Sequence, residues 1–172
     1  MSSLSSHGAA GAPKPAGIAK YAIWLPQLVA AGIIGLTLPF KLGGAPETVW
    51  LFNEISTQSG LGVDEALLRY FTAANEILAI ILILIPRTSI FGALHVMALM
   101  SGALVTHLAL IGIQVPGPNK DGVVVTGQEL DGGTLFVMGL VTFAAAVAVL
   151  ITRRSQVKRF ASAPVCYIKG TA

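Results

Sequence analysis

The fold of this chain is decided by the stretch ILAIILILI at residues 77–85, a run of apolar side chains that cannot all face water. The apolar character begins at Phe71, and no turn-forming residue interrupts it before Pro86. The run is therefore longer than a buried strand and is typical of a helix. A helix needs about 20 mainly apolar residues to cross the hydrocarbon core of a membrane. The stretch predicts a membrane span over residues 65–85.

The composition of the whole chain indicates the same environment. The 172 residues have a mean hydropathy of +0.77, with 54% hydrophobic and only 11% charged residues. A soluble domain carries roughly 25% charged residues. Because so few charges cannot cover a surface that faces water, the composition excludes a soluble enzyme, a disordered chain and a coiled coil.

Three further apolar segments predict spans at about 21–40, 89–113 and 133–152. The predicted fold class is all-α: a polytopic membrane protein whose four-transmembrane-helix bundle occupies residues 20–153. Residues 1–19, rich in Ser, Ala, Gly and Pro, predict a flexible cytoplasmic N-terminal tail. Residues 154–172 predict a basic cytoplasmic tail with the one cysteine, Cys166. A single cysteine excludes an internal disulfide, a CxxC pair and a thiolate metal cluster.

The first long connection, residues 41–66, holds a second helix signal. Residues 47–56 are rich in apolar side chains and follow a proline suited to a helix start. We expect a short interfacial helix there, with Trp50 and Phe52 as anchors at the level of the lipid headgroups; the alternative is a structured loop. The second connection, 114–132, contains three successive valines at 123–125 that suit one arm of a hairpin. Together the two connections are expected to form a cap over the outer end of the bundle.

The basic residues divide unequally between the two sides of the predicted bundle. With both termini in the cytoplasm, the inner side holds Lys14, Lys20, Arg87, Arg153, Arg154, Lys158, Arg159 and Lys169, and the outer side holds Lys41, Arg69 and Lys120. This bias predicts an N-in, C-in orientation. The basic tail then has a partner in an anionic leaflet of the lipid bilayer, and no nucleic acid is needed to explain it.

Small residues recur within the predicted spans, among them Gly92, Ala98 and Gly102. Ala98 and Gly102 have the small-xxx-small spacing that lets membrane helices approach closely. The pattern supports a compact bundle but indicates no particular partner.

Charged residues inside a membrane span are costly, so each is a candidate functional residue. Arg69 lies near the outer start of the second span, and Glu76 lies seven residues deeper, about 10 Å along the helix axis. Seven residues turn through nearly two full turns, so both side chains share one face with Thr72 and Ala79. That face is small and polar, which predicts that it points into the bundle and gives Glu76 a polar partner.

Three more polar residues come to the same outer zone by topology. His107 lies in the outer third of the third span, Lys41 ends the first span and Asp131 precedes the fourth. The zone is either an ion-pair network that joins the helices or a pocket for a small polar or quinone-like ligand, and Glu76 with His107 is the best candidate for a proton-handling pair. His95 lies about 18 Å from His107 along the helix, so the two cannot hold one haem. His95 is expected to be a packed, hydrogen-bonded histidine, and no metal site is predicted.

Several motifs in order resemble the DoxX family of four-helix bacterial membrane proteins. They are residues 41–49 closing the first span, Glu76-Ile77-Leu78 with 82–88, Gly92-Ala93-Leu94 with 100–103 and Thr106-His107-Leu108, and Asp131-Gly132-Gly133. The resemblance covers about residues 20–153. It implies a four-helix fold and a bacterial inner-membrane location.

The resemblance also implies an association with redox chemistry, since founding members are small subunits of a quinone-reducing membrane oxidoreductase. We therefore expect an accessory subunit of a membrane-bound, quinone-linked redox complex, without catalytic activity by itself and with other membrane subunits as partners. The alternatives are a stand-alone quinone-binding or small-molecule-binding membrane protein and a structural or assembly factor of a larger membrane complex. No sequence motif for a bound cofactor is present, but a quinone ligand fits the resemblance.

Overall fold

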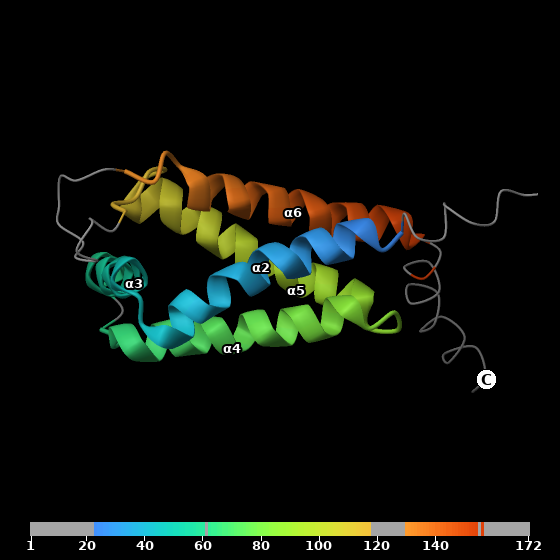
Figure 1. Ribbon diagram of the computed structural model, residues 1–172, viewed down its shortest axis with the longest axis horizontal. Helices are drawn as coiled ribbons and strands as arrows, with labels where there is room; N and C mark the ends of the chain where they lie inside the picture. The colour runs from blue at the N-terminus through green and yellow to red at the C-terminus, as the bar shows by residue number, and fades with distance from the viewer. Residues whose placement is uncertain (1–22, 61, 118–129, 155, 157–172) are drawn as a thin grey trace, which may run out of the picture.

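The computed structural model is all-helical in the part of the chain that it describes, residues 23–60, 62–117, 130–154 and 156 (Figure 1). No strand is present in these segments; one isolated bridge pairs Pro116 with Leu130. The predicted N-terminal tail, most of the basic C-terminal tail with Cys166, and the valines at 123–125 lie outside the described residues.

Four helices are long and apolar enough to cross a membrane, as the sequence predicts. They are α2 (Leu25–Gly43), α4 (Glu65–Leu84), α5 (Ser89–Thr106), which one π-helical turn η1 (His107–Ile111) extends, and α6 (Thr134–Thr152). Their outer faces expose large apolar side chains; Leu36, Phe71 and Leu108 are 67%, 66% and 66% exposed. Such surface is compatible with lipid and not with water, so the chain is a multi-pass membrane protein in contact with the bilayer.

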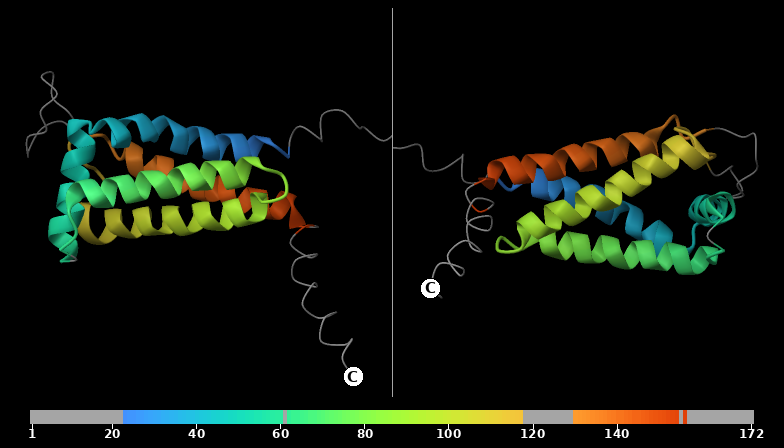
Figure 2. Two further views of the ribbon diagram at one scale, coloured as in Figure 1. Left: turned by 90° about the horizontal axis from the view of Figure 1, so that it is seen from below. Right: turned by 180° about the vertical axis from the view of Figure 1, so that it is seen from behind.

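A fifth helix, α3 (Pro46–Ser59), crosses one end of the bundle, where Figure 1 shows it end-on and Figure 2 shows it from the side. Glycines with positive φ stand on both sides of it: Gly44, with φ 66°, turns the chain out of α2, and Gly60, with φ 66°, ends α3. Asp64 then caps α4 by accepting hydrogen bonds from the backbone N–H groups of Ala66 and Leu67 at 2.9 and 3.2 Å. The helix expected in the first connection is confirmed.

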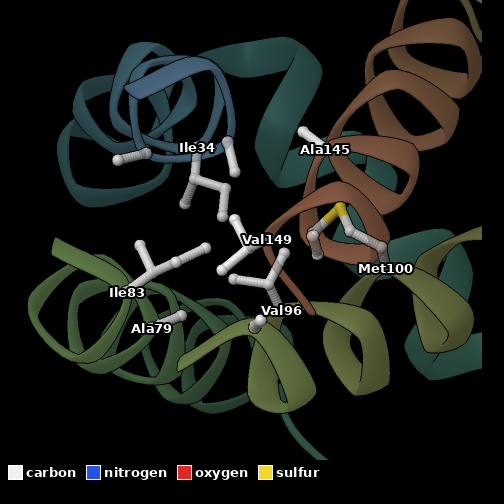
Figure 3. Packing of buried hydrophobic residues seen from close by; sticks show 11 residues of the cluster. Ile34, Ala79, Ile83, Val96, Met100, Ala145 and Val149 are labelled. Carbon is white, nitrogen blue, oxygen red and sulfur yellow. The ribbon is translucent and has the colours of Figure 1, made fainter. Parts of the chain in front are cut away.

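The core contains one branched side chain from each span, Ile34, Ile83, Val96 and Val149, which point toward one another (Figure 3). Small residues around them let the helices approach closely. Gly92 is the extreme case, because a Cβ atom there would overlap the backbone of α4 at Leu82 and Ile83.

The helices are not parallel. They lie close together at the end where α6 finishes and the α4–α5 turn lies, and they spread apart toward α3 (Figures 1 and 2). We call these the Arg153 end and the α3 end.

Candidate ligand-binding cavity

The α3 end contains a cavity of about 740 Å³ that residues of α2, α3, α4, α5, η1 and α6 line. Its walls are mainly apolar, and a few ionisable groups reach it, among them Lys41, Glu76 and His107. Ligand sites of proteins commonly enclose roughly 300–1,000 Å³ with this composition. Three of the five polar residues that the sequence predicts for one zone thus line one cavity, whereas Arg69 and Asp131 do not line it.

The centre of the polar lining is an ion pair between α2 and α4. The Lys41 ammonium donates to both carboxylate oxygens of Glu76, at 2.7 and 2.8 Å, and to the hydroxyl of Thr37 at 2.9 Å. An ammonium has three N–H donors, so all of them are used. Glu76 is 5% exposed. The prediction that it has a polar partner inside the bundle is confirmed, and the partner is Lys41.

The face of α4 that holds Glu76 is oriented as its spacing predicts. Arg69, two turns before Glu76, and Ala79, about one turn after it, are buried, whereas Leu78 and Ile81 are exposed toward the lipid. Small residues on this face bring α4 close to α2, which places Glu76 within reach of a lysine at the end of α2.

Arg69 lies on the same face but has other partners. Its guanidinium donates to Glu65 on the preceding turn at 2.6 Å and to the backbone carbonyl oxygen of Lys41, and it lies 4.5 Å from the Tyr70 ring centroid. It thereby ties the start of α4 to the end of α2. Its guanidinium holds in place the backbone of the residue that pairs with Glu76.

Asp131 organises the chain between η1 and α6. Its carboxylate accepts hydrogen bonds from the backbone N–H groups of Val115, Gly133 and Leu135 at 3.0, 2.9 and 3.1 Å. These three donors, which belong to this segment and to the first turn of α6, are all backbone N–H groups. Asp131 therefore fixes the start of α6 and does not join the polar lining of the cavity.

The two histidines of α5 and η1 both line the cavity, and each bonds to a backbone carbonyl. Nδ1 of His107 is 2.9 Å from the oxygen of Gly112, and Nε2 of His95 is 3.2 Å from the oxygen of Asn75. Because a carbonyl only accepts, these nitrogens carry the hydrogen. The expected hydrogen bond of His95 is confirmed. No hydrogen bond joins Glu76 to His107: His107 bonds to Gly112, the residue directly after its π-helical turn, and Glu76 bonds to Lys41.

Helix α3 closes the cavity at its wide end. Thr48, Leu51, Phe52 and Ile55 line it, and Phe52 is only 5% exposed. The first connection therefore forms part of the expected cap, while the central part of the second connection lies outside the described residues. Phe52 points into the protein, so the predicted role as a headgroup anchor is left to Trp50, which is half-buried.

The cavity presents mainly hydrogen-bond acceptors. The hydroxyls of Thr37, Thr72 and Thr142 donate to carbonyl oxygens of their own helices, and the Lys41 donors are used. The Glu76 carboxylate keeps free lone pairs, and the second carboxylate at the cavity is that of Glu47, which the sequence placed in the expected interfacial helix but did not single out as a site residue. The hydroxyl of Thr48 differs from the other lining hydroxyls, because it is a donor with no partner in the described residues.

Sequence reasoning missed a second buried polar cluster, at the Arg153 end. The side-chain amide of Gln27, fully buried, donates to the carbonyl oxygen of Ile83 at 2.7 Å and accepts from Nη2 of Arg153 at 2.9 Å. Nη1 of Arg153 donates to the carbonyl oxygen of Pro86 at 3.3 Å. Burial lowers the pKa of the Arg153 guanidinium from its usual value. In the sequence, Arg153 resembles any basic residue that follows a membrane span, and the residues next to it in the chain do not indicate that it is buried.

No group of three or more His, Cys, Asp or Glu side chains that could hold a metal ion occurs in the described part of the chain. Comparisons with protein-family models, with curated proteins and with solved structures found no match. The site itself is therefore the basis for a functional proposal.

Proposed function

We propose that this small integral membrane protein binds an apolar molecule with hydroxyl groups, of which a quinol is the leading candidate, in the cavity at the α3 end. The observation that carries the proposal is a mainly apolar cavity of about 740 Å³ whose polar lining accepts hydrogen bonds and donates few. A quinol donates through two hydroxyls, whereas a quinone only accepts. The reduced form therefore matches the free lone pairs of Glu76 better than the oxidised form does.

The cavity is suited to a ligand that arrives from the lipid. Leu36 and Phe40 of α2 line it and are 67% and 53% exposed. On α5, Ala98 and Gly102 also line the cavity and are also exposed. An apolar molecule dissolved in the bilayer can reach such a cavity without crossing water, which supports a lipid-soluble ligand.

The resemblance to the DoxX family supplies the setting that we propose for this binding. A small subunit that holds quinol beside a redox partner combines the expected accessory role with the expected ligand. Purification in mild detergent tests this setting: a stoichiometric set of redox subunits would support it, and a single small protein that carries quinol would favour the stand-alone alternative.

The binding experiment uses the full chain in detergent and measures thermal stabilisation by decylubiquinol and decylubiquinone under anaerobic conditions. The expected result is a preference for the quinol of about fivefold or more, since acceptors left unpaired by the quinone cost free energy. Glu76→Gln should reduce that preference, because an amide replaces a carboxylate of the same shape. Glu54→Gln, which makes the same change on α3 outside the cavity lining, is the matched control.

Failure of both molecules to stabilise the wild-type protein would overturn the proposal. So would an unchanged quinol preference in Glu76→Gln when Glu54→Gln behaves in the same way.

A further inference from the structure

The Arg153 end holds a buried cation whose bonding is incomplete. Arg153 is 8% exposed, and of the five N–H donors of its guanidinium two are used, by Pro86 and Gln27. Its Nε is buried and has no partner in the described residues. Buried arginine donors are normally paired, because an unpaired charged group loses its hydration without compensation.

No acidic side chain in the described part of the chain belongs to this end. The Asp and Glu residues that the structure describes lie within positions 47–76 and at position 131, away from the start of α2, the α4–α5 turn and the end of α6. The partners of Arg153 are a carbonyl and an amide, which are neutral. The π face of Trp24, with its centroid 5.8 Å from the Arg153 Cζ, and the C-terminus of α6 reduce the cost of the charge but supply no anion.

Arg153 lies directly beyond the end of a candidate membrane span. It follows the last residue of α6, and Pro86, to which it bonds, comes directly after the α4 cap. The neighbouring Arg87 and Arg154 are both exposed. Three arginines thus lie in the α4–α5 turn and directly after α6, just beyond the ends of candidate membrane spans.

We propose that this end binds the phosphate of an anionic phospholipid, with Arg153 as the central ligand-binding residue. Phosphate oxygens are acceptors only, and a guanidinium with unused N–H groups holds them in a bidentate manner. The lipid supplies the negative charge that the described residues do not provide at this position. The site is separate from the cavity at the α3 end, so it does not depend on the quinol proposal.

The experiment measures thermal stabilisation of the full chain in neutral detergent by three probes. Dihexanoyl-phosphatidylglycerol, which is anionic, is expected to bind about tenfold more tightly than the zwitterionic dihexanoyl-phosphatidylcholine, and inorganic phosphate is expected to have no effect at equal concentration. Arg153→Gln should weaken phosphatidylglycerol binding by about tenfold or more. Arg154→Gln, which removes the same charge from an exposed neighbour, should weaken it by less than about threefold.

Arg153→Lys keeps the proposal testable if Arg153→Gln does not fold. The ammonium retains the charge but lacks the planar fork, so affinity for phosphatidylglycerol should fall about fivefold. Equal losses in Arg153→Lys and Arg154→Gln would overturn the proposal, because the basic surface as a whole would then attract the lipid. Stabilisation by inorganic phosphate as strong as that by the anionic lipid would also overturn it and would assign the site to a free anion.

Discussion

The two ends of the bundle use buried polar side chains in different ways. At the Arg153 end, Gln27 and Arg153 cross-link three parts of the chain in closely packed surroundings, and the helices come together around them. At the α3 end, Lys41 and Glu76 join only α2 and α4, and a cavity of about 740 Å³ remains beside the pair. The difference shows that a polar contact between membrane helices does not by itself close the space around it.

Side-chain volume explains why one end is packed and the other is open. Two glycines of α5 illustrate it: a Cβ at Gly92 would overlap α4, whereas a Cβ at Gly102 would have no atom within 4 Å apart from its own helix. Because α4 and α5 approach closely at Gly92, the bundle is narrow at this end. The distance between helices then grows along their length, and α3 covers the opening (Figure 2).

The largest expected effect comes from breaking the packed end. Gly92→Leu should destabilise the protein by about 3 kcal/mol or more, because α4 and α5 must separate to admit a side chain. The free energy of unfolding can be measured by steric trapping in mild detergent. Gly32→Leu, at a position with open space around it, is the control and should change stability by less than about 1 kcal/mol. Similar losses in both variants would contradict the close contact.

The ion pair gives the second largest expected effect. Glu76→Leu leaves the Lys41 ammonium unpaired and should cost about 2 kcal/mol, less than for a fully enclosed pair because the cavity adjoins it. The double variant Lys41→Met with Glu76→Leu should recover most of that loss. The same unfolding assay measures the wild type, the single variants Glu76→Leu and Lys41→Met, and the double variant. Additive losses in the double variant would show that the two side chains are not coupled.

A smaller effect is expected from Gln27→Leu at the packed end. The substitution leaves the carbonyl of Ile83 and one N–H of Arg153 without partners, which should cost about 1.5 kcal/mol. Quinol binding at the far end should be unchanged. Gln58→Leu, on the exposed side of α3, is the control for loss of a glutamine. A parallel loss of quinol affinity in Gln27→Leu would mean that the two ends are coupled.

The smallest effect on stability is expected from filling the open end. Gly102→Leu projects a side chain from the cavity lining, and stability should change by less than about 1 kcal/mol, partly because leucine favours helix over glycine. Decylubiquinol affinity should nevertheless fall about tenfold, as measured by thermal stabilisation. Gly32→Leu, outside the cavity, should leave affinity unchanged. Retention of full affinity in Gly102→Leu would place the ligand elsewhere.

The sequence was informative wherever one helix decides the outcome. Spans follow from long apolar runs, and the inward direction of Glu76 follows from the residues above and below it on α4. Axial depth follows from the rise per residue, which is why Lys41, Glu76 and His107 were expected at one level. Each of these properties is local to one helix.

Pairing and packing depend on rotations and crossings between helices, which one helix cannot encode. Lys41 is the partner of Glu76, whereas His107, at the start of a π-helical turn, bonds to Gly112. Asp131 was expected with the intramembrane groups, but the nearest unpaired groups are backbone N–H donors at the start of α6, and it bonds to them.

Two pairs of residues show what the sequence alone does not distinguish. In the sequence, Gly92 and Gly102 are two glycines of the same predicted span, and Arg153 and Arg154 are two basic residues that follow another. The sequence by itself determined that all four residues lie in or beside membrane helices. Only the tertiary structure decided that Gly92 contacts α4 while Gly102 borders a cavity, and that Arg153 is buried while Arg154 is exposed. The physical reason is that neighbouring or similar residues differ in the face of the helix they occupy, and a face acquires meaning only when a second helix packs against it.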